Sequence, residues 1–260
     1  MKKVFVLVIA IAMLFAFTAC GGRAAAPPAG GSPTAPGGSP TTPTTPGGSP
    51  TTPAKGEVAY KTTYSNARVW TDSIGSKWVQ VIVEIENTGT VPLYLSSGSV
   101  DLEDSSGTLV KSLSLVSAFP DVIDPGEKGY YYDETTIDNE DVTGLVVVPR
   151  PDVRKAKVDN IKFNVSEFSL SDDKYFGIHM IGRVENTSDE EAGMTYVGAV
   201  LFDSNDTPIG LLYTIVSGKL EPGDKVGFEG SALTLPRDIK ADTVARYEVF
   251  AYPSQMQFDF

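Results

Sequence analysis

The chain has 260 residues, enough for one or two domains of ordinary size. It contains one cysteine, Cys20, and one histidine, His179, which excludes an intramolecular disulfide and a zinc site with several Cys and His ligands. The formal net charge is −12, and all 33 acidic residues lie after residue 56, where they outnumber 17 basic residues. A body this acidic repels nucleic acid and anionic lipid headgroups, so nucleic acid is not expected as a partner.

The first 20 residues have the pattern of a secretory leader. Lys2 and Lys3 give a positive start, and Val4 to Phe17 is an unbroken run of 14 apolar residues. A run of this length suits a signal peptide and is shorter than the roughly 18 residues of a membrane span. It ends in Phe17-Thr18-Ala19-Cys20, which resembles the lipobox of bacterial lipoproteins, although leucine is the usual residue where Phe17 stands.

The lipobox resemblance implies a signal peptide over residues 1–19, cleavage between Ala19 and Cys20, and transfer of a diacylglyceryl group to the thiol of Cys20. Acyl chains at this position would anchor the protein to the bacterial cell membrane, with the body on the extracytoplasmic side. The alternative is ordinary secretion with a free thiol at Cys20.

Residues 20–56 are predicted to be a disordered linker. Between residues 21 and 54, every residue except Arg23 is Gly, Ala, Pro, Ser or Thr. Gly-Gly-Ser-Pro-Thr recurs in this segment, at 30–34, 37–41 and 47–51. Because such side chains build no core, we expect a tether with polyproline II character that holds the body away from the membrane.

Residues 57–260 have the alternating apolar pattern of β-strands, and helical periodicity is hard to find. Two strands of this kind, 79–86 and 178–185, run into the same phrase, Glu-Asn-Thr, at 86–88 and at 185–187. Asparagine suits a turn after a strand because its side chain bonds the nearby backbone. The two strands therefore predict equivalent positions in two related units.

Later features repeat at nearly the same spacing. The pair Leu102 and Asp104 recurs as Leu201 and Asp203, and Pro125-Gly126 recurs as Pro222-Gly223, with the geometry of a type II turn expected at each Pro-Gly. A repeat near 100 residues indicates two copies of a whole domain. We predict an all-β fold of two tandem immunoglobulin-like β-sandwich domains. The first spans residues 57–150 and the second spans residues 158–260, with a polar connector at 150–157.

These shared features resemble the FxLYD-type domain of bacterial lipoproteins and secreted proteins. The name motif falls on residues 199–203, where Leu201 and Asp203 match, Phe202 replaces tyrosine and the first position departs. The first copy keeps only the leucine and the aspartate of the motif. The resemblance implies an immunoglobulin-like sandwich with an extracellular role and no shared catalytic residues, and a fold alone supplies no function.

Chemically active side chains form no constellation in the sequence. His179 alternates away from the core, and no Gly-x-Ser-x-Gly motif occurs in the body. Acidic residues gather at 101–104, 138–141 and 189–191 without the ligand spacing of an EF-hand and without a spacing that selects a glycosidase pair. We predict no catalytic residue, no metal site and no cofactor, with solvated loop acids as the interpretation and calcium binding as the alternative.

A candidate binding patch is predicted on the outer face of the first copy. Trp78 alternates away from the core, and Tyr130 and Tyr132 point outward if Tyr131 points inward. In the sandwich of the FxLYD type these two strands are antiparallel neighbours, so Trp78 is expected to approach Tyr132 or Tyr130. An exposed patch of this kind stacks on sugar rings or anchors a protein partner. The alternative is that residues 57–70 or the second copy cover the three aromatic residues and make them structural.

Together these features predict a cell-surface lipoprotein that acts as a non-catalytic binding or assembly module displayed on a tether. Its expected partners are the membrane, through lipidated Cys20, and an envelope protein or wall polymer. Two alternatives stay open. One is a cell-envelope enzyme, such as a glycan hydrolase that uses loop carboxylates, and the other is an accessory protein of a transport system.

Overall fold

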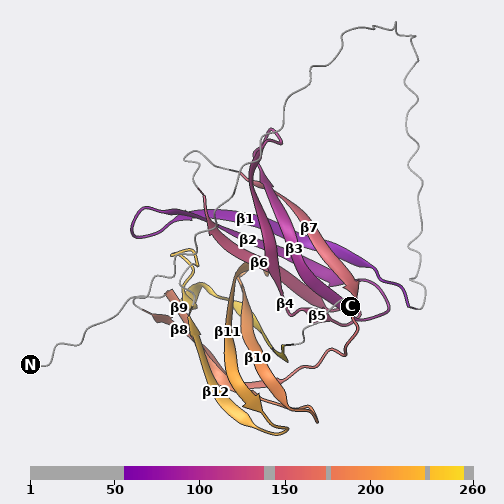
Figure 1. Ribbon diagram of the computed structural model, residues 1–260. Coiled ribbons are helices and arrows are strands. Elements are labelled where there is room, and N and C mark those ends of the chain that lie inside the picture. The colour runs from indigo at the N-terminus through magenta and orange to yellow at the C-terminus, as the bar shows by residue number, and fades with distance from the viewer. Residues whose placement is uncertain (1–55, 138–143, 174–176, 232–234, 255–260) are drawn as a thin grey trace, which may run out of the picture. The chain divides into compact units, whose positions relative to one another are not determined.

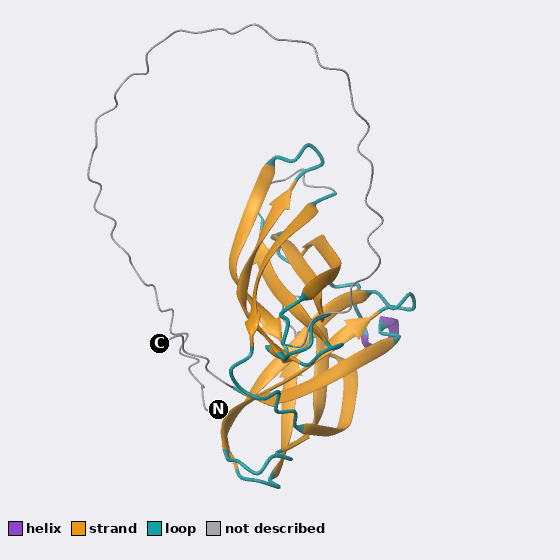
Figure 2. Cartoon of the chain, turned by 90° about the vertical axis from the view of Figure 1, so that its right-hand side faces the viewer, coloured by secondary structure: helices purple, strands orange, loops and turns teal. Residues whose placement is uncertain are grey.

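The computed structural model describes residues 56–137, 144–173, 177–231 and 235–254. The predicted leader, the linker and Cys20 lie outside the described residues, as does the acidic stretch 138–141. Pro50–Phe260 form one compact unit. Its described part consists almost wholly of antiparallel strands, with a single 3-10 turn at Ala241–Thr243, as Figures 1 and 2 show. This confirms the predicted all-β sandwich class.

The first half of the unit contains seven strands. They are β1 (Tyr60–Thr71), β2 (Lys77–Asn87), β3 (Leu93–Glu103), β4 (Leu109–Phe119), β5 (Val122–Ile123), β6 (Lys128–Thr136) and β7 (Val146–Lys155). Their pairing order is β1-β2-β6-β4-β3-β5, with β7 added beside β3. The apolar residues of β2, β3 and β4 meet in one core together with Tyr131 of β6. Tyr131 therefore points inward, as predicted.

The second half repeats this pairing. Its strands are β8 (Asn164–Asp173), β9 (Gly177–Glu185), β10 (Ala192–Phe202), β11 (Pro208–Leu220), β12 (Lys225–Ser231) and β13 (Arg246–Pro253). They form the sheets β12-β9-β8 and β11-β10-β13. The first half pairs β6-β2-β1 and β4-β3-β7 in the same order. The repeated phrases of the sequence therefore occupy equivalent places in the strand topology.

A buried asparagine closes the turn after the second strand of each half. The side-chain amide of Asn87 donates to the carbonyl oxygens of Val91 (2.9 Å) and Ile123 (3.0 Å), and its oxygen accepts from the Gly89 N–H (3.0 Å). Asn186 repeats all three bonds, with the carbonyl oxygens of Glu190 and Leu220 and the N–H of Ser188 as partners. The Glu-Asn-Thr sequence thus contains, in each half, the asparagine whose side chain forms a buried hydrogen-bond network.

The Pro-Gly pairs form the predicted type II turns. In the first half the N–H of Glu127 donates to the Asp124 carbonyl at 2.9 Å, and Gly126 has φ +85°. Gly126 also donates its N–H to the carbonyl of Asn87 at 2.8 Å, which joins the turn to the asparagine network. The second half repeats these contacts with the N–H of Asp224 on Glu221 and with Gly223, at φ +86°, on Asn186.

The prediction of a polar connector at 150–157 is wrong for residues 150–155. Strand β7 continues through Arg150 to Lys155 and pairs with β3. Backbone pairing at the sheet edge overrides the polar composition of this segment. Pro149 and Pro151 are tolerated because an edge strand leaves alternate N–H positions without a partner.

The two halves share buried surface. Ile82, Phe119, Tyr130 and Tyr132 of the first half belong to the same buried apolar cluster as the core of the second half. The outer face of β2 and β6 is therefore an internal junction. The cavities of the candidate binding site lie along this junction.

Candidate binding site

The aromatic residues predicted as an outer patch do not form one exposed surface. Tyr130 and Tyr132 are 2% and 8% exposed, because the second half covers them. Strands β2 and β6 are antiparallel neighbours, as predicted, but their register places Trp78 opposite Thr136 and Ile82 opposite Tyr132. Trp78 therefore lies beyond both tyrosines along the strand. The prediction of one exposed patch shared by the three residues is wrong. The second half covers both tyrosines, which was the alternative.

Trp78 supports the β1–β2 hairpin. Its ring stacks on Trp70, with centroids 6.1 Å apart, and its indole N–H donates to the Asp72 carboxylate at 3.0 Å. The same carboxylate accepts backbone N–H groups from Ile74 and Ser76 in the hairpin turn. The hydrogen bond from Trp78 and those from the turn lower the pKa of Asp72.

The two buried tyrosines contact carboxylates within the junction. Tyr130 donates its hydroxyl to Glu248 of β13 at 3.3 Å, and its ring meets Phe202 edge to face. Tyr132 donates to Glu134 and accepts from the side-chain amide of Gln80 at 3.1 Å. Burial raises the pKa of both hydroxyls, so they act as neutral donors that stabilise the junction.

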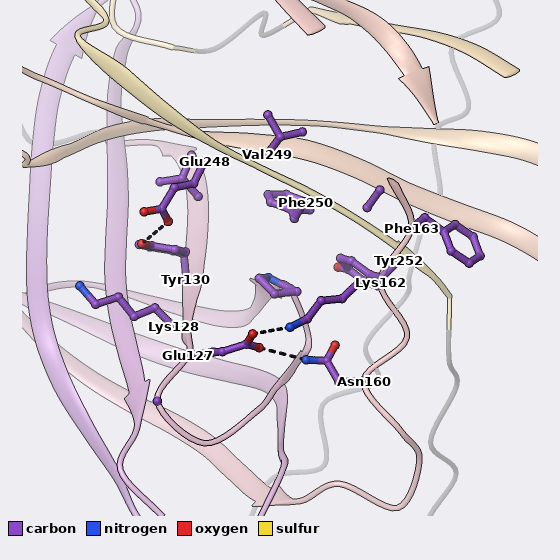
Figure 3. A pocket seen from close by; sticks show the side chains of 14 residues that line it. Glu127, Lys128, Tyr130, Asn160, Lys162, Phe163, Glu248, Val249, Phe250 and Tyr252 are labelled. Atoms are coloured by element: carbon purple, nitrogen blue, oxygen red, sulfur yellow. Dashed lines mark hydrogen bonds and ion pairs between the residues drawn. The ribbon is translucent and has the colours of Figure 1, made fainter. Parts of the chain in front are cut away.

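One cavity at the junction, of about 450 Å³, is drawn in Figure 3. Glu127 accepts from Asn160 at 3.0 Å and forms an ion pair with Lys162, while Lys128 pairs with Glu84 at 2.8 Å. Burial raises the pKa of Glu127, but the Lys162 ammonium and the other hydrogen bonds outweigh it and lower the pKa below its ordinary value. Because these charges pair with one another, we interpret the side chains that line the cavity as a structural contact between the first half and the segment before β8.

A second hollow, of about 320 Å³, adjoins a smaller one of about 230 Å³, and both are lined by Ser117, Phe119 and Tyr213. We call these two hollows together the junction groove. Its lining comes from both halves of the unit. Its aromatic residues are Tyr94, Phe119, Tyr132, Tyr196, Tyr213 and Tyr252, and its serines are Ser97, Ser117 and Ser254.

The rings of the groove stack on one another across the junction. Phe119 of β4 stacks on Tyr213 of β11, with centroids 4.6 Å apart and an interplanar angle of 29°. Tyr196 stacks on Tyr252 at 5.5 Å and meets Phe119 edge to face at 6.4 Å. Tyr213 remains 48% exposed although it is held in this stack. The groove thus presents an aromatic ring, fixed in place, to solvent.

The rim of the groove is apolar and contains a strained residue. Leu115 is 79% exposed and has φ +61°, a left-handed conformation that leucine rarely adopts. It sits at a shift in the β3–β4 register, between the pairs Gly98–Val116 and Ser99–Ser114. A bulge of this kind redirects a side chain and is common beside functional sites. Ile215, which is 40% exposed, continues the apolar rim on β11.

Three acidic residues, Asp121, Asp133 and Glu134, line the groove, and no lysine or arginine does among the described residues. Burial raises the pKa of Asp121 to about 6. Burial also raises the pKa of Glu134 to about 7, against the opposing hydrogen bonds of Tyr132 and Gln80. The pKa of Asp133 is raised by the same cause. The groove is therefore acidic and hydroxyl-rich.

Replacing Glu134 by glutamine should make the stability of the protein less sensitive to pH. The pKa of Glu134 is about 7 in the folded protein, above its ordinary 4.5. The folded state therefore binds this proton more tightly than the unfolded state, and the stabilisation is lost as pH rises from about 4.5 through 7. Glutamine cannot ionise, so the variant should gain several degrees in Tm over the original at pH 8 and little at pH 4.

The measurement is thermal unfolding of both proteins across this pH range. Asp121 and Asp133 are present in both proteins, and the charge of Asp133 adds to the effect of burial on the pKa of Glu134. The exposed Glu190 provides a matched control, because Glu190→Gln removes a carboxyl group from solvent and should change Tm at pH 8 far less than Glu134→Gln. A difference for Glu134→Gln that stays flat from pH 4 to pH 8 would show that the carboxyl is not desolvated.

His179, predicted on an outer face, is partly exposed, with its Nε2 3.9 Å from the carboxylate of Glu229. Within the described residues no group of three or more His, Cys, Asp and Glu side chains could hold a metal ion. No helix among them is long and apolar enough to cross a membrane.

No protein-family model matches the chain, and no curated protein matches it. The functional argument therefore rests on the groove. No motif predicted the groove, because most of its residues come from β3, β4, β6, β10, β11 and β13 and meet only in the folded unit.

Proposed function

We propose that this protein is a non-catalytic binding module that holds a saccharide chain in the junction groove. The observation that carries the proposal is the stacked and half-exposed ring of Tyr213. A ring fixed in this way offers its face to the apolar face of a sugar at little cost in side-chain entropy. The hydroxyl groups of the neighbouring tyrosines and serines provide donors and acceptors for sugar hydroxyls.

The carboxyl groups of the groove favour binding over hydrolysis. A glycosidase holds two carboxyl groups on either side of the scissile bond at a set separation. Asp133 and Glu134 are consecutive residues of β6, and successive side chains of a strand project from opposite faces. Such a pair does not face a common bond. These groups therefore act as hydrogen-bond acceptors for a bound ligand.

The N-terminal sequence supports a place for this activity. Cys20 carries the lipid that anchors the chain to the cell membrane, and residues 20–56 tether the body on the extracytoplasmic side. The two halves are FxLYD-type modules in this proposal. A tethered body of this kind meets the saccharide polymers of the cell wall, and these are the ligands that the groove chemistry suits.

Replacing Tyr213 by alanine should weaken retention on insoluble wall polysaccharide by about fivefold, because stacking of the exposed ring is worth roughly 1 kcal/mol. The experiment uses the soluble unit Pro50–Phe260, which contains both cores and lacks Cys20. Its readout is the bound fraction in a sedimentation assay against increasing polysaccharide. Because Tyr213 is half exposed, the variant should keep its fold, which circular dichroism checks.

A matched control is available in Tyr247, which is 43% exposed but does not line the groove. Tyr247→Ala should bind the polysaccharide as the original does. Equal retention of the Tyr213 variant and the original, or an equal loss in both variants, would contradict the proposed site.

A further inference from the structure

The Figure 3 cavity and the junction groove differ in the partners of their charged side chains. In the cavity of Figure 3, Glu127 faces the Lys162 ammonium, and Lys128 reaches Glu84. The junction groove has carboxyl groups in its lining and no lysine or arginine beside them among the described residues. Lys111 influences Asp133 electrostatically but lies outside the lining. Hydrogen bonds therefore hold these carboxyl groups, from the backbone of Asp121 and Val122 to Asp121 and from Tyr132 and Gln80 to Glu134, while no cation of the described lining pairs with them.

Asp121 is the carboxylate residue of the larger of the two hollows, which four tyrosines also line. It lies between β4 and β5, where its backbone carbonyl accepts the N–H of Leu95 at 2.7 Å. Tyr252 hydrogen-bonds to the backbone of Asp121, and the pKa of its hydroxyl is raised mainly by burial and further by the Asp121 carboxylate. Asp121 thus lines the same hollow as Tyr94, Tyr196, Tyr213 and Tyr252.

An aromatic enclosure with a carboxylate is the setting that recognises an ammonium group. Ring faces attract a cation through their quadrupole, and a partly desolvated carboxylate gains most from a partner of opposite charge. A phosphate or carboxylate polymer is disfavoured here, because it would meet the groove carboxylates and a body of strongly negative charge. A neutral sugar would leave the buried negative charge without compensation.

We propose that the saccharide in the junction groove carries amino groups, and that the Asp121 carboxylate pairs with a sugar ammonium against the tyrosine rings. This inference rests on the proposed function and names its ligand class: an amino-sugar chain with free cationic amines. The stacked Tyr213 holds the sugar ring, and Asp121 selects the charge. The two residues therefore have separable effects on binding.

The test compares chito-oligosaccharides of one length that differ only at the sugar nitrogen. One is fully N-acetylated and neutral, and the other is N-trimethylated, with a cationic charge that does not depend on pH. Calorimetric titration of the soluble unit Pro50–Phe260 should show the cationic oligomer bound about tenfold more tightly. Asp121→Asn should reduce this preference to near unity, because it weakens binding of the cationic oligomer far more than binding of the neutral one. Tyr213→Ala should weaken both.

General attraction by the acidic body is controlled with Asp189→Asn, which removes one negative charge from an exposed loop away from the groove. This variant should keep the full preference for the cationic oligomer. If Asp189→Asn and Asp121→Asn reduce the preference equally, the selection is non-specific and the inference is overturned.

The remaining outcomes separate this inference from the proposed function. Equal binding of both oligomers, lost in Tyr213→Ala, would overturn the amino-sugar inference and leave saccharide binding in place. Binding of neither oligomer, with a dimer in sedimentation that Tyr213→Ala turns into a monomer, would overturn both and make the groove an interface between copies. Capture of an envelope protein through Tyr213 without oligomer binding would also overturn both.

Discussion

Replacing Asn186 by alanine should lower the free energy of unfolding by about 3–5 kcal/mol, because each buried polar group left without a partner costs about 1–3 kcal/mol. The Asn186 side chain is fully buried, and its amide donates to the carbonyl oxygens of Glu190 and Leu220, both at 2.8 Å. Its oxygen also accepts the N–H of Ser188. Alanine would remove all three bonds, and the Glu190 carbonyl would keep only the bond from the Ser188 hydroxyl at 3.1 Å. Chemical denaturation monitored by tryptophan fluorescence and circular dichroism measures the loss.

Asn87→Ala should have a similar effect, since Asn87 is 1% exposed and makes the equivalent bonds in the first half. Asn186→Asp keeps the shape of the side chain but removes the donors, so it should destabilise as well. The exposed Asn164 is the matched control, and Asn164→Ala should change stability by less than about 0.5 kcal/mol. If the buried variants were as stable as this control, the asparagine networks would not support the fold.

Cys20→Ser in the full chain should release the protein from the membrane fraction completely. A serine hydroxyl does not replace the thiol that accepts the lipid, and without acyl chains a body this acidic has no affinity for anionic headgroups. Cell fractionation followed by mass spectrometry of the mature N-terminus gives the readout. Arg23→Ala, three residues away and without a role in lipidation, should remain with the membrane.

The anchoring prediction is contradicted if the wild-type protein has an unmodified Cys20 in its N-terminal peptide, or if it is cut elsewhere than after Ala19. So would a Cys20→Ser variant that stays in the membrane fraction. Either result leaves the groove proposal standing, because the groove lies wholly in Pro50–Phe260.

Local signals in the sequence predicted the strand-rich class and the repeated turns. Alternation over 79–86 identified β2 because one face of a strand packs into a core, and Val79, Val81 and Val83 are fully buried there. Gly126 and Gly223 have the positive φ that a type II turn requires, and this requirement is visible in the Pro-Gly pairs. These features depend on neighbouring residues alone, so one sequence suffices to infer them.

The junction could not be predicted in the same way. Alternation tells which strand positions share a face but not which element covers that face. Ile82, Tyr130 and Tyr132 are large apolar residues on the face that was expected to meet solvent, and this was the available signal for a covering partner. The groove depends on the packing of the two halves, and Tyr213 and Asp121 line it from segments far apart in the sequence. No local pattern records such a meeting.

The most direct measurement of a saccharide in the junction groove is an NMR titration of the soluble unit Pro50–Phe260 with the cationic oligomer. Binding in the groove predicts chemical-shift changes at Tyr94 and Ser117 of the first half and at Tyr213 of the second, with Glu127 and Lys162 of the Figure 3 cavity unperturbed. Shifts confined to the Figure 3 cavity, or no shifts at millimolar oligomer, would contradict the junction groove as the binding site.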